Sequence, residues 1–258
     1  MDLLKDLAGI VIDCVGMLRT DAPSAFRYTL IIGFLLAACC WIVCSCYSRL
    51  WNKQFRITLM HHILCGAASI CTLILVLVFS GLRFVPQIVD RLIDNWQGTI
   101  LKDNVWRKST FLKAYDEVSS LGIEDFRECS PYRCIPVAKK ESRRIAATVF
   151  AMQAVHHFQN VHPYLGILLR ARSEIPVKVI DDDIDNFFAA RPNLRTYEGG
   201  ADNAVVLAAA HIRNVLQERL PPLIPKSRAV TAAFFLFVQI IPFGLTGLSA
   251  YRDLKATV

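Results

Sequence analysis

Three stretches of this chain contain no charged residue, and that absence decides the fold class. Residues 28–47, 57–82 and 229–250 are free of Asp, Glu, Lys and Arg. A helix of about 20 apolar residues is long enough to cross the hydrocarbon core of a bilayer. A soluble domain does not usually collect its apolar residues in uncharged runs of this length. The absence of charge therefore predicts three transmembrane helices.

The sequence also lacks the short motifs that mark common catalytic and nucleotide-binding sites. It contains no P-loop, no G-x-S-x-G, no G-x-G-x-x-G and no H-E-x-x-H. No internal repeat or low-complexity segment appears either. We therefore expect a protein that is not an enzyme and needs no cofactor. The only ligand for which the sequence contains candidate residues is a divalent cation, which clustered aspartates or histidines could bind.

A dense basic stripe is missing as well, although the net charge is +7. Basic and acidic residues nearly balance within residues 84–226, which argues against a nucleic-acid partner, because phosphate binding needs clustered cations. The short linker 48–56 instead contains Arg49, Lys53 and Arg56 and no acidic residue. Such a linker beside apolar runs is typical of membrane orientation and contact with lipid headgroups.

The order of these segments predicts an all-α integral membrane protein. An α-rich soluble domain is inserted between the second and third transmembrane helices, and an N-terminal amphipathic helix precedes the first. That helix would lie in the membrane interface or pack on the rest of the protein. The expected segments are the amphipathic helix 1–20, transmembrane helices 28–47 and 57–82 with the basic linker 48–56 between them, the helical domain 84–226, the third transmembrane helix 229–250 and a tail 251–258.

Two local patterns refine the expected domain 84–226. Apolar residues at helical spacing predict a long helix over Ala201–Leu220, stopped by Pro221 and Pro222, because proline lacks the N–H that a helix interior needs. Residues Ile175–Ile180 read IPVKVI and have the β-branched character of a short strand. We therefore expect a mainly helical domain with at most a small sheet.

Small and polar residues within the spans predict where transmembrane helices contact one another. Gly33 and Ala37, and likewise Gly66 and Ser69, make faces on which another helix can approach closely. Gln239 should find a partner on another helix, since an unpaired amide in lipid is costly. Pro242 predicts a kink in the third span.

Charge and cysteine usage indicate which side of the membrane carries the domain. The basic linker favours the cytoplasmic face, so residues 84–226 are expected on the other side of a plasma membrane or bacterial inner membrane. Cationic residues that border the opposite ends of the spans weaken this rule. Cys129 and Cys134 could form a small disulfide loop, which would fit an oxidising compartment, or remain two unrelated thiols.

An acidic cluster at residues 181–185 is the strongest candidate for metal chemistry. Asp181, Asp182 and Asp185 match the D-D-x-x-D pattern with which prenyl-transferring enzymes hold magnesium diphosphate, and Asp181, Asp183 and Asp185 could bind calcium. No second acidic motif accompanies them. The alternative is a solvated acidic turn at the start of a helix, where carboxylates are favoured.

His156, His157 and His162 form a second candidate metal cluster. Their spacing is not that of a metalloprotease helix. Pro163 could turn the chain so that His162 folds back toward the other two. The alternative interpretation is ordinary core or surface histidines at the end of a helix.

Together these features predict a non-catalytic membrane subunit or scaffold of a multi-protein assembly of the secretion, conjugation or transport type. Its partners would be the lipid bilayer and other membrane subunits or further copies of the chain. One alternative is a membrane-anchored binding or immunity protein whose exported domain captures another protein. A further alternative is a magnesium-dependent lipid or prenyl enzyme that uses Asp181–Asp185.

Overall fold

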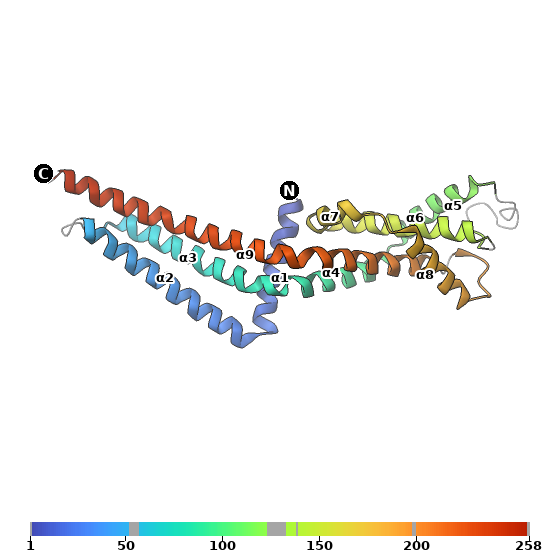
Figure 1. Cartoon of the computed structure of the whole chain (residues 1–258), viewed down its shortest axis with the longest axis horizontal. Coiled ribbons are helices and arrows are strands. Elements are labelled where there is room, and N and C mark those ends of the chain that lie inside the picture. The colour runs from blue at the N-terminus through green and yellow to red at the C-terminus, as the bar shows by residue number, and fades with distance from the viewer. Residues whose placement is uncertain (1, 52–56, 123–132, 138, 198–199, 257–258) are drawn as a thin grey trace. The chain divides into compact units, whose positions relative to one another are not determined.

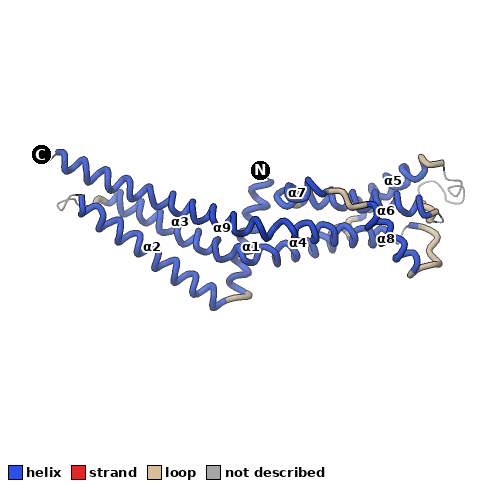
Figure 2. The backbone as a smooth tube through the Cα atoms, viewed as in Figure 1, coloured by secondary structure: helices blue, strands red, loops and turns tan. Residues whose placement is uncertain are grey.

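The computed structural model describes residues 2–51, 57–122, 133–137, 139–197 and 200–256. Helices account for most of these residues (Figure 2), and no strand occurs among them. One isolated antiparallel bridge joins Pro136 to Thr196. The predicted all-α fold is therefore confirmed for the described part of the chain.

The chain divides into two compact units. The first comprises Met1–Leu7 and Val89–Leu220, and we call it the body; the second comprises Ala8–Ile88 and Pro221–Val258, and we call it the bundle. Three helices pass from one unit into the other along the chain: α1 (Asp2–Thr20), α4 (Val85–Ile100) and α9 (Gly200–Ala256).

The bundle is built from long apolar helices. Figure 1 shows α2 (Pro23–Trp51), α3 (Leu59–Gly81) and the C-terminal part of α9 side by side. Among the described helices, three segments are long and apolar enough to cross a membrane: Pro23–Tyr47, Leu59–Ile100 and Gly200–Lys255. Their apolar 18-residue stretches have mean hydropathies of 2.4, 2.5 and 1.9. The second segment joins α3 to α4 through the short 3-10 helix η1 (Leu82–Phe84).

The body packs around α6 (Lys140–Val161). This helix contacts α5 (Asn104–Ser119), α7 (Pro163–Leu169) and α8 (Val177–Ala189), and the 3-10 helix η3 (Arg170–Arg172) continues α7. Small buried residues on α6 let its neighbours approach, while aromatic rings fill the remaining space. The buried residues of α6 include Ala146, Ala147, Phe150, Ala151, Ala154 and Phe158.

Two local expectations are wrong. The helix that starts at Gly200 does not stop at Pro221 and Pro222 but runs through them, and through Pro225 and Pro242, to Ala256. Proline removes a hydrogen bond, yet its fixed φ near −65° is compatible with a helix. The short strand expected over Ile175–Ile180 is absent, because Val177 begins α8. Ile180 lies buried on α8 with Ile184 and Phe188, so the burial of one helical face outweighs local β propensity.

The N-terminal helix α1 packs against α3 within the bundle. Ile10, Cys14, Met17 and Leu18 form its buried face. Gly81, the last residue of α3, is buried, and a Cβ atom at this position would lie 3.3 Å from the backbone carbon of Cys14. A side chain at this position would therefore press on the backbone of α1. The packed arrangement does not test whether α1 also lies in a membrane interface, which stays a prediction.

Replacing Gly81 with leucine should destabilise the bundle by about 1–3 kcal/mol, because the new side chain would push α1 away from α3. Gly66→Leu on the same helix is the matched control, since within the described residues no heavy atom of another segment lies within 4 Å of a Cβ at Gly66. The melting temperatures of the two purified variants provide the measurement. Equal melting temperatures would contradict the close α1–α3 contact.

Candidate functional site

Polar side chains inside the bundle bond to one another across helices. Gln239 of α9 donates its amide N–H to Thr72 Oγ1 of α3 over 2.7 Å, and both residues are buried. Thr72 in turn donates to the Ala68 carbonyl over 2.8 Å. Gln239, which was expected to need a partner on another helix, therefore has one.

A second polar contact ties α2 to both of its neighbours. Cys44 Sγ lies 3.3 Å from Thr246 Oγ1 of α9 and 3.9 Å from Cys65 Sγ of α3. Thr246 also donates to the carbonyl of Pro242, four residues earlier, over 2.6 Å. The Thr246 hydroxyl thus bonds to the backbone of its own helix, a bond that threonine commonly makes inside helices.

Of the small residues expected at helix contacts, those on α2 lie at a close contact with another helix, whereas Gly66 on α3 does not. Ala37 is buried, and a Cβ at Gly33 would come within 3.0 Å of Leu73 Cδ2, so α2 approaches α3 closely there. In contrast, a Cβ at Gly66 would meet no heavy atom of another described segment within 4 Å. Ser69 donates to the Cys65 carbonyl of its own helix.

A double-mutant cycle should detect the Gln239–Thr72 hydrogen bond. We expect Thr72→Val to lower the free energy of unfolding, because it leaves the buried Gln239 amide without its acceptor. In the Gln239→Leu background the same substitution should lower it less, because the amide is already absent. The coupling energy should be about 0.6–1.7 kcal/mol, the range for hydrogen bonds between helices in membranes.

Thr231→Val is the matched control for this cycle. Thr231 bonds to the Ser227 carbonyl of its own helix, as Thr72 does to Ala68, but makes no contact with Gln239 among the bonds observed. Its effect should add to that of Gln239→Leu without coupling. A coupling near zero for the Thr72 pair would contradict the interhelical bond.

The three candidate histidines of the body point to different partners. Trp96 Nε1 donates to His157 Nδ1 over 3.0 Å, and the Trp106 ring also contacts the His157 ring. His156 contacts Asn160 of the same helix. His162 Nδ1 lies 3.4 Å from a carboxylate oxygen of Asp6, whose other oxygen accepts the Tyr164 backbone N–H. These contacts match the interpretation as ordinary structural histidines.

Burial lowers the pKa of His157 from its ordinary value, and His156 and His162 add to the effect, while the Asp103 carboxylate opposes it. The hydrogen bond from Trp96 requires an unprotonated Nδ1. His157 is therefore held in its neutral form in the folded body.

The stability of the body should fall as the pH drops below about 6.5, the ordinary histidine pKa. The unfolded chain takes up the His157 proton at a higher pH than the folded chain does, so acid favours unfolding. His157→Gln, which does not titrate, should lose less stability between pH 7.5 and pH 5.5 than the wild type. Thermal unfolding followed by tryptophan fluorescence measures this difference. His156→Gln is the control: His156 contributes less than burial to the lowered pKa of His157, so this variant should change the pH dependence less than His157→Gln does. If both variants behave alike, His157 is not the responsible group.

The acidic cluster on α8 is divided among separate neighbours. Asp183 accepts from Asn203 of α9, and Asp185 pairs with Lys140 of α6 over 2.7 Å. The hydrogen bond to Asp185 raises the pKa of Lys140. Asp182 is exposed, whereas Asp181 Oδ1 is buried without a hydrogen-bond partner in the described residues. The structure therefore spreads these carboxylates over different contacts.

Among the described residues, no group of three His, Cys, Asp or Glu side chains is placed to hold a metal ion. The D-D-x-x-D and histidine hypotheses thus gain no geometric support. Tyr197, beside the cluster, is buried against Phe150 and Phe188, and burial raises its pKa, with the Asp183 charge adding to the effect. Tyr197 is therefore held as a neutral phenol.

Several predicted positions fall outside what the structure describes. Lys53, Arg56 and Cys129 lie outside the described residues, and of Arg49 only its place in α2 is described. The Cys129–Cys134 disulfide and the role of the basic linker therefore stay predictions.

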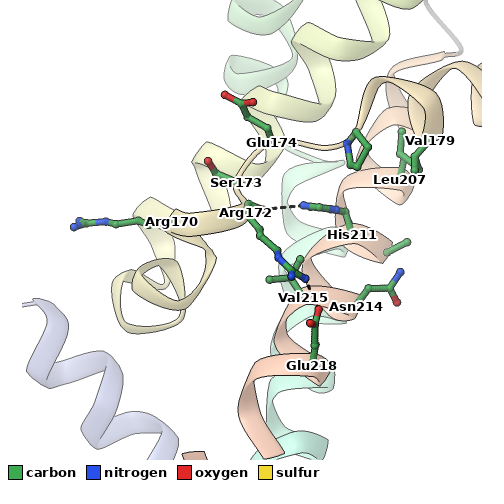
Figure 3. A pocket seen from close by; sticks show the side chains of 12 residues that line it. Arg170, Arg172, Ser173, Glu174, Val179, Leu207, His211, Asn214, Val215 and Glu218 are labelled. Atoms are coloured by element: carbon green, nitrogen blue, oxygen red, sulfur yellow. Dashed lines mark hydrogen bonds and ion pairs between the residues drawn. The ribbon is translucent and has the colours of Figure 1, made fainter. Parts of the chain in front are cut away.

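A cavity of about 670 Å³ opens on the body between η3, α8 and α9 (Figure 3). Arg172 extends toward Glu218 and forms an ion pair with it, while His211 Nε2 lies 3.0 Å from the Arg172 carbonyl. Arg170 points away from these groups in Figure 3. The cavity is therefore lined by charges that already balance each other.

The sequence offered no signal for this cavity. Arg172 and Glu218 are 46 residues apart and belong to no motif. The side chains contain no nucleophile held against a base, and the ion pair needs no ligand to neutralise it. The cavity can bind a polar molecule, but its lining indicates no particular reaction.

Comparisons with protein-family models, with curated proteins and with solved structures found no match.

Proposed function

We propose that this chain is an integral membrane subunit, in which α2, α3 and the C-terminal part of α9 span the bilayer and support an assembly of several proteins. The observation that carries the proposal is the outward surface of these helices. Large apolar side chains on each of them are mostly exposed, among them Phe34 (60%), Ile63 (57%) and Ile240 (64%). Water disfavours such a surface, whereas hydrocarbon accepts it.

The interior of the bundle supports a structural rather than a catalytic role. Most of its buried polar residues are engaged in the contacts between helices described above, namely Cys44, Cys65, Thr72, Gln239 and Thr246, while Thr29 is buried as well. Each of these contacts holds one helix against another. These contacts supply what a scaffold needs, a defined packing of spans without chemistry of its own.

The body supplies surface for protein partners. It exposes several large apolar side chains, including Val105 (80%), Val177 (56%), Val161 (50%) and Val206 (48%). Single exposed apolar residues are normal on any protein, but burying several of them against other subunits would favour assembly. We place the body on the non-cytoplasmic side, because the basic linker 48–56 favours the cytoplasm.

Alkaline carbonate extraction followed by native mass spectrometry in mild detergent tests the proposal. We expect the chain to stay in the membrane pellet and to appear as a homo-oligomer or with a stoichiometric partner. Release into the supernatant would contradict membrane insertion. A monomer without partners under conditions that preserve known complexes would contradict the subunit role.

The cavity beside Arg172 and Glu218 favours a second candidate function, a membrane-anchored protein that binds a soluble molecule through its body. The two candidates differ in what accompanies the chain. A subunit should co-purify with membrane proteins, and its association should survive Glu218→Gln. A binding protein should instead lose its soluble ligand in that variant.

A further inference from the structure

A second hollow lies within the bundle, among the proposed membrane spans. It is a groove of about 360 Å³ between α2, α3 and α9, and its walls include Ile32, Leu36, Val76, Phe79 and Phe235. Small-molecule pockets typically measure about 300–1,000 Å³. A partner helix is about 10–12 Å across, and a groove of this volume suits a single flexible chain better than a helix.

The polarity of the groove changes along its length. Helix α3 runs antiparallel to both α2 and α9. Gly33 of α2 faces Leu73 and Cys44 lies beside Cys65. Gln239 of α9 bonds to Thr72, and Ser249 lies beside His61. The hydroxyl residues Thr29, Ser80 and Thr231 therefore line the same end of the groove. Leu36, Leu75 and Phe235 line the other end. A ligand that fits must be polar at one end and apolar at the other.

An arginine stands at the hydroxyl end. The guanidinium carbon of Arg228 lies 5.6 Å from the centroid of the Phe79 ring, and Phe79 lines the groove. Arg228 Nε is buried and has no hydrogen-bond acceptor among the described residues. A ring face attracts the cation but does not satisfy its N–H donors. The arginine therefore needs an acceptor that the described residues do not supply at Nε.

The same end of the bundle has an excess of positive charge. Arg27 lies in the first turns of α2, Arg83 directly follows α3, and Lys226 precedes Arg228 in α9. Asp21 is the nearest acidic residue in the sequence of the bundle. A phosphate group suits this end, since guanidinium binds phosphate oxygens through paired, charge-assisted hydrogen bonds.

We propose that this groove binds one anionic phospholipid, with an acyl chain along Ile32, Val76 and Phe235 and its phosphate on the guanidinium of Arg228. The inference rests on the proposed membrane insertion. The apolar walls account for the acyl chain, and the hydroxyl residues lie where the glycerol and ester groups would be. The guanidinium group of Arg228, next to the lining residue Phe79, would donate to the phosphate through its terminal N–H groups. The surplus of cations favours a lipid with net negative charge over a zwitterionic one.

The experiment adds phosphatidylglycerol or phosphatidylcholine with identical acyl chains to the delipidated full-length protein in mild detergent, and counts bound lipids by native mass spectrometry. We expect one phosphatidylglycerol per chain to bind about tenfold more tightly than phosphatidylcholine. Inorganic phosphate alone should not compete, because it cannot fill the groove. Competition by phosphate would overturn a lipid site in favour of a simple anion site.

Two variants probe the two ends of the site. Arg228→Gln should weaken phosphatidylglycerol binding about tenfold, whereas Arg252→Gln, which removes the same charge from the exposed C-terminal end of α9, should not. Ala232→Phe should block the acyl chain by filling the groove while every charge remains. Equal lipid retention by the wild type, Arg228→Gln and Ala232→Phe would overturn the proposal.

Melting temperatures establish that the variants are folded, and if one of them is not, the other still decides the question. Failure of this inference is distinct from failure of the proposed function. A chain that resists carbonate extraction but binds both lipids alike is a membrane protein without this lipid site. A chain that carbonate releases has neither.

Discussion

The bundle depends on hydrogen bonds between its helices, of which the bond from Gln239 to Thr72 is the clearest. A polar side chain inside a bundle of apolar helices needs a hydrogen-bond partner, and a neighbouring helix supplies it. The outer faces of α2, α3 and α9 are apolar. Their polar groups gather inside, where Gln239 meets Thr72 and Cys44 meets Thr246. Apolar side chains can pack with a helix turned to several angles about its own axis. Hydrogen bonds are directional, so they favour a single angle. The register of the helices follows from them, and so do the position of the groove and the close approach at Gly33.

The body follows a different rule, in which small and large residues alternate around one helix. Alanines on α6 admit its neighbours, and the aromatic rings of Trp96, Trp106, Phe150 and Tyr197 close the space between them. Charged residues remain mostly at the rim and pair there, as Lys140 does with Asp185 and Arg213 with Asp90. Partly exposed pairs of this kind contribute little to stability. Asp183, Asp185 and the three histidines that suggested metal sites each make a separate local contact.

The sequence predicted the features that depend on long segments, and missed those that depend on tertiary contacts. The uncharged runs identified the three long apolar helices because length and hydrophobicity need no knowledge of neighbours. The helix through Pro221 and Pro222 was not predictable from the prolines alone, because they disfavour but do not forbid a helix whose other residues are well packed. Residues Val177–Ile180 likewise have β propensity, but the spacing of Ile180, Ile184 and Phe188 suits the helical face that the body buries.

The candidate sites show the same division. The amide of Gln239 signalled a need for a partner, yet nothing in the sequence identified Thr72 as that partner. Asp181 to Asp185 and the three histidines were conspicuous because they are adjacent in the sequence. The side chains of the aspartates on α8 and of His156 and His157 on α6 diverge, since neighbouring residues on a helix point about 100° apart, and His162 lies beyond the end of α6. The cavity of Arg172 and Glu218 and the groove near Arg228 join distant segments, so only the folded chain reveals them.

The polar contacts of α9 also bear on the order in which the chain is made. During synthesis α2 and α3 emerge before residues Val89–Leu220 of the body, and Gln239 is made later than all of these. Before α9 is made, Thr72 can bond to its own helix through the Ala68 carbonyl, so the hairpin of α2 and α3 contains no unsatisfied hydroxyl at this position. Gln239 has no such local substitute among the contacts observed, so the last span is the one that requires its neighbours to be in place already. With the spans inserted as proposed, a misfolded α2–α3 hairpin would leave this amide unpaired in lipid, a costly defect.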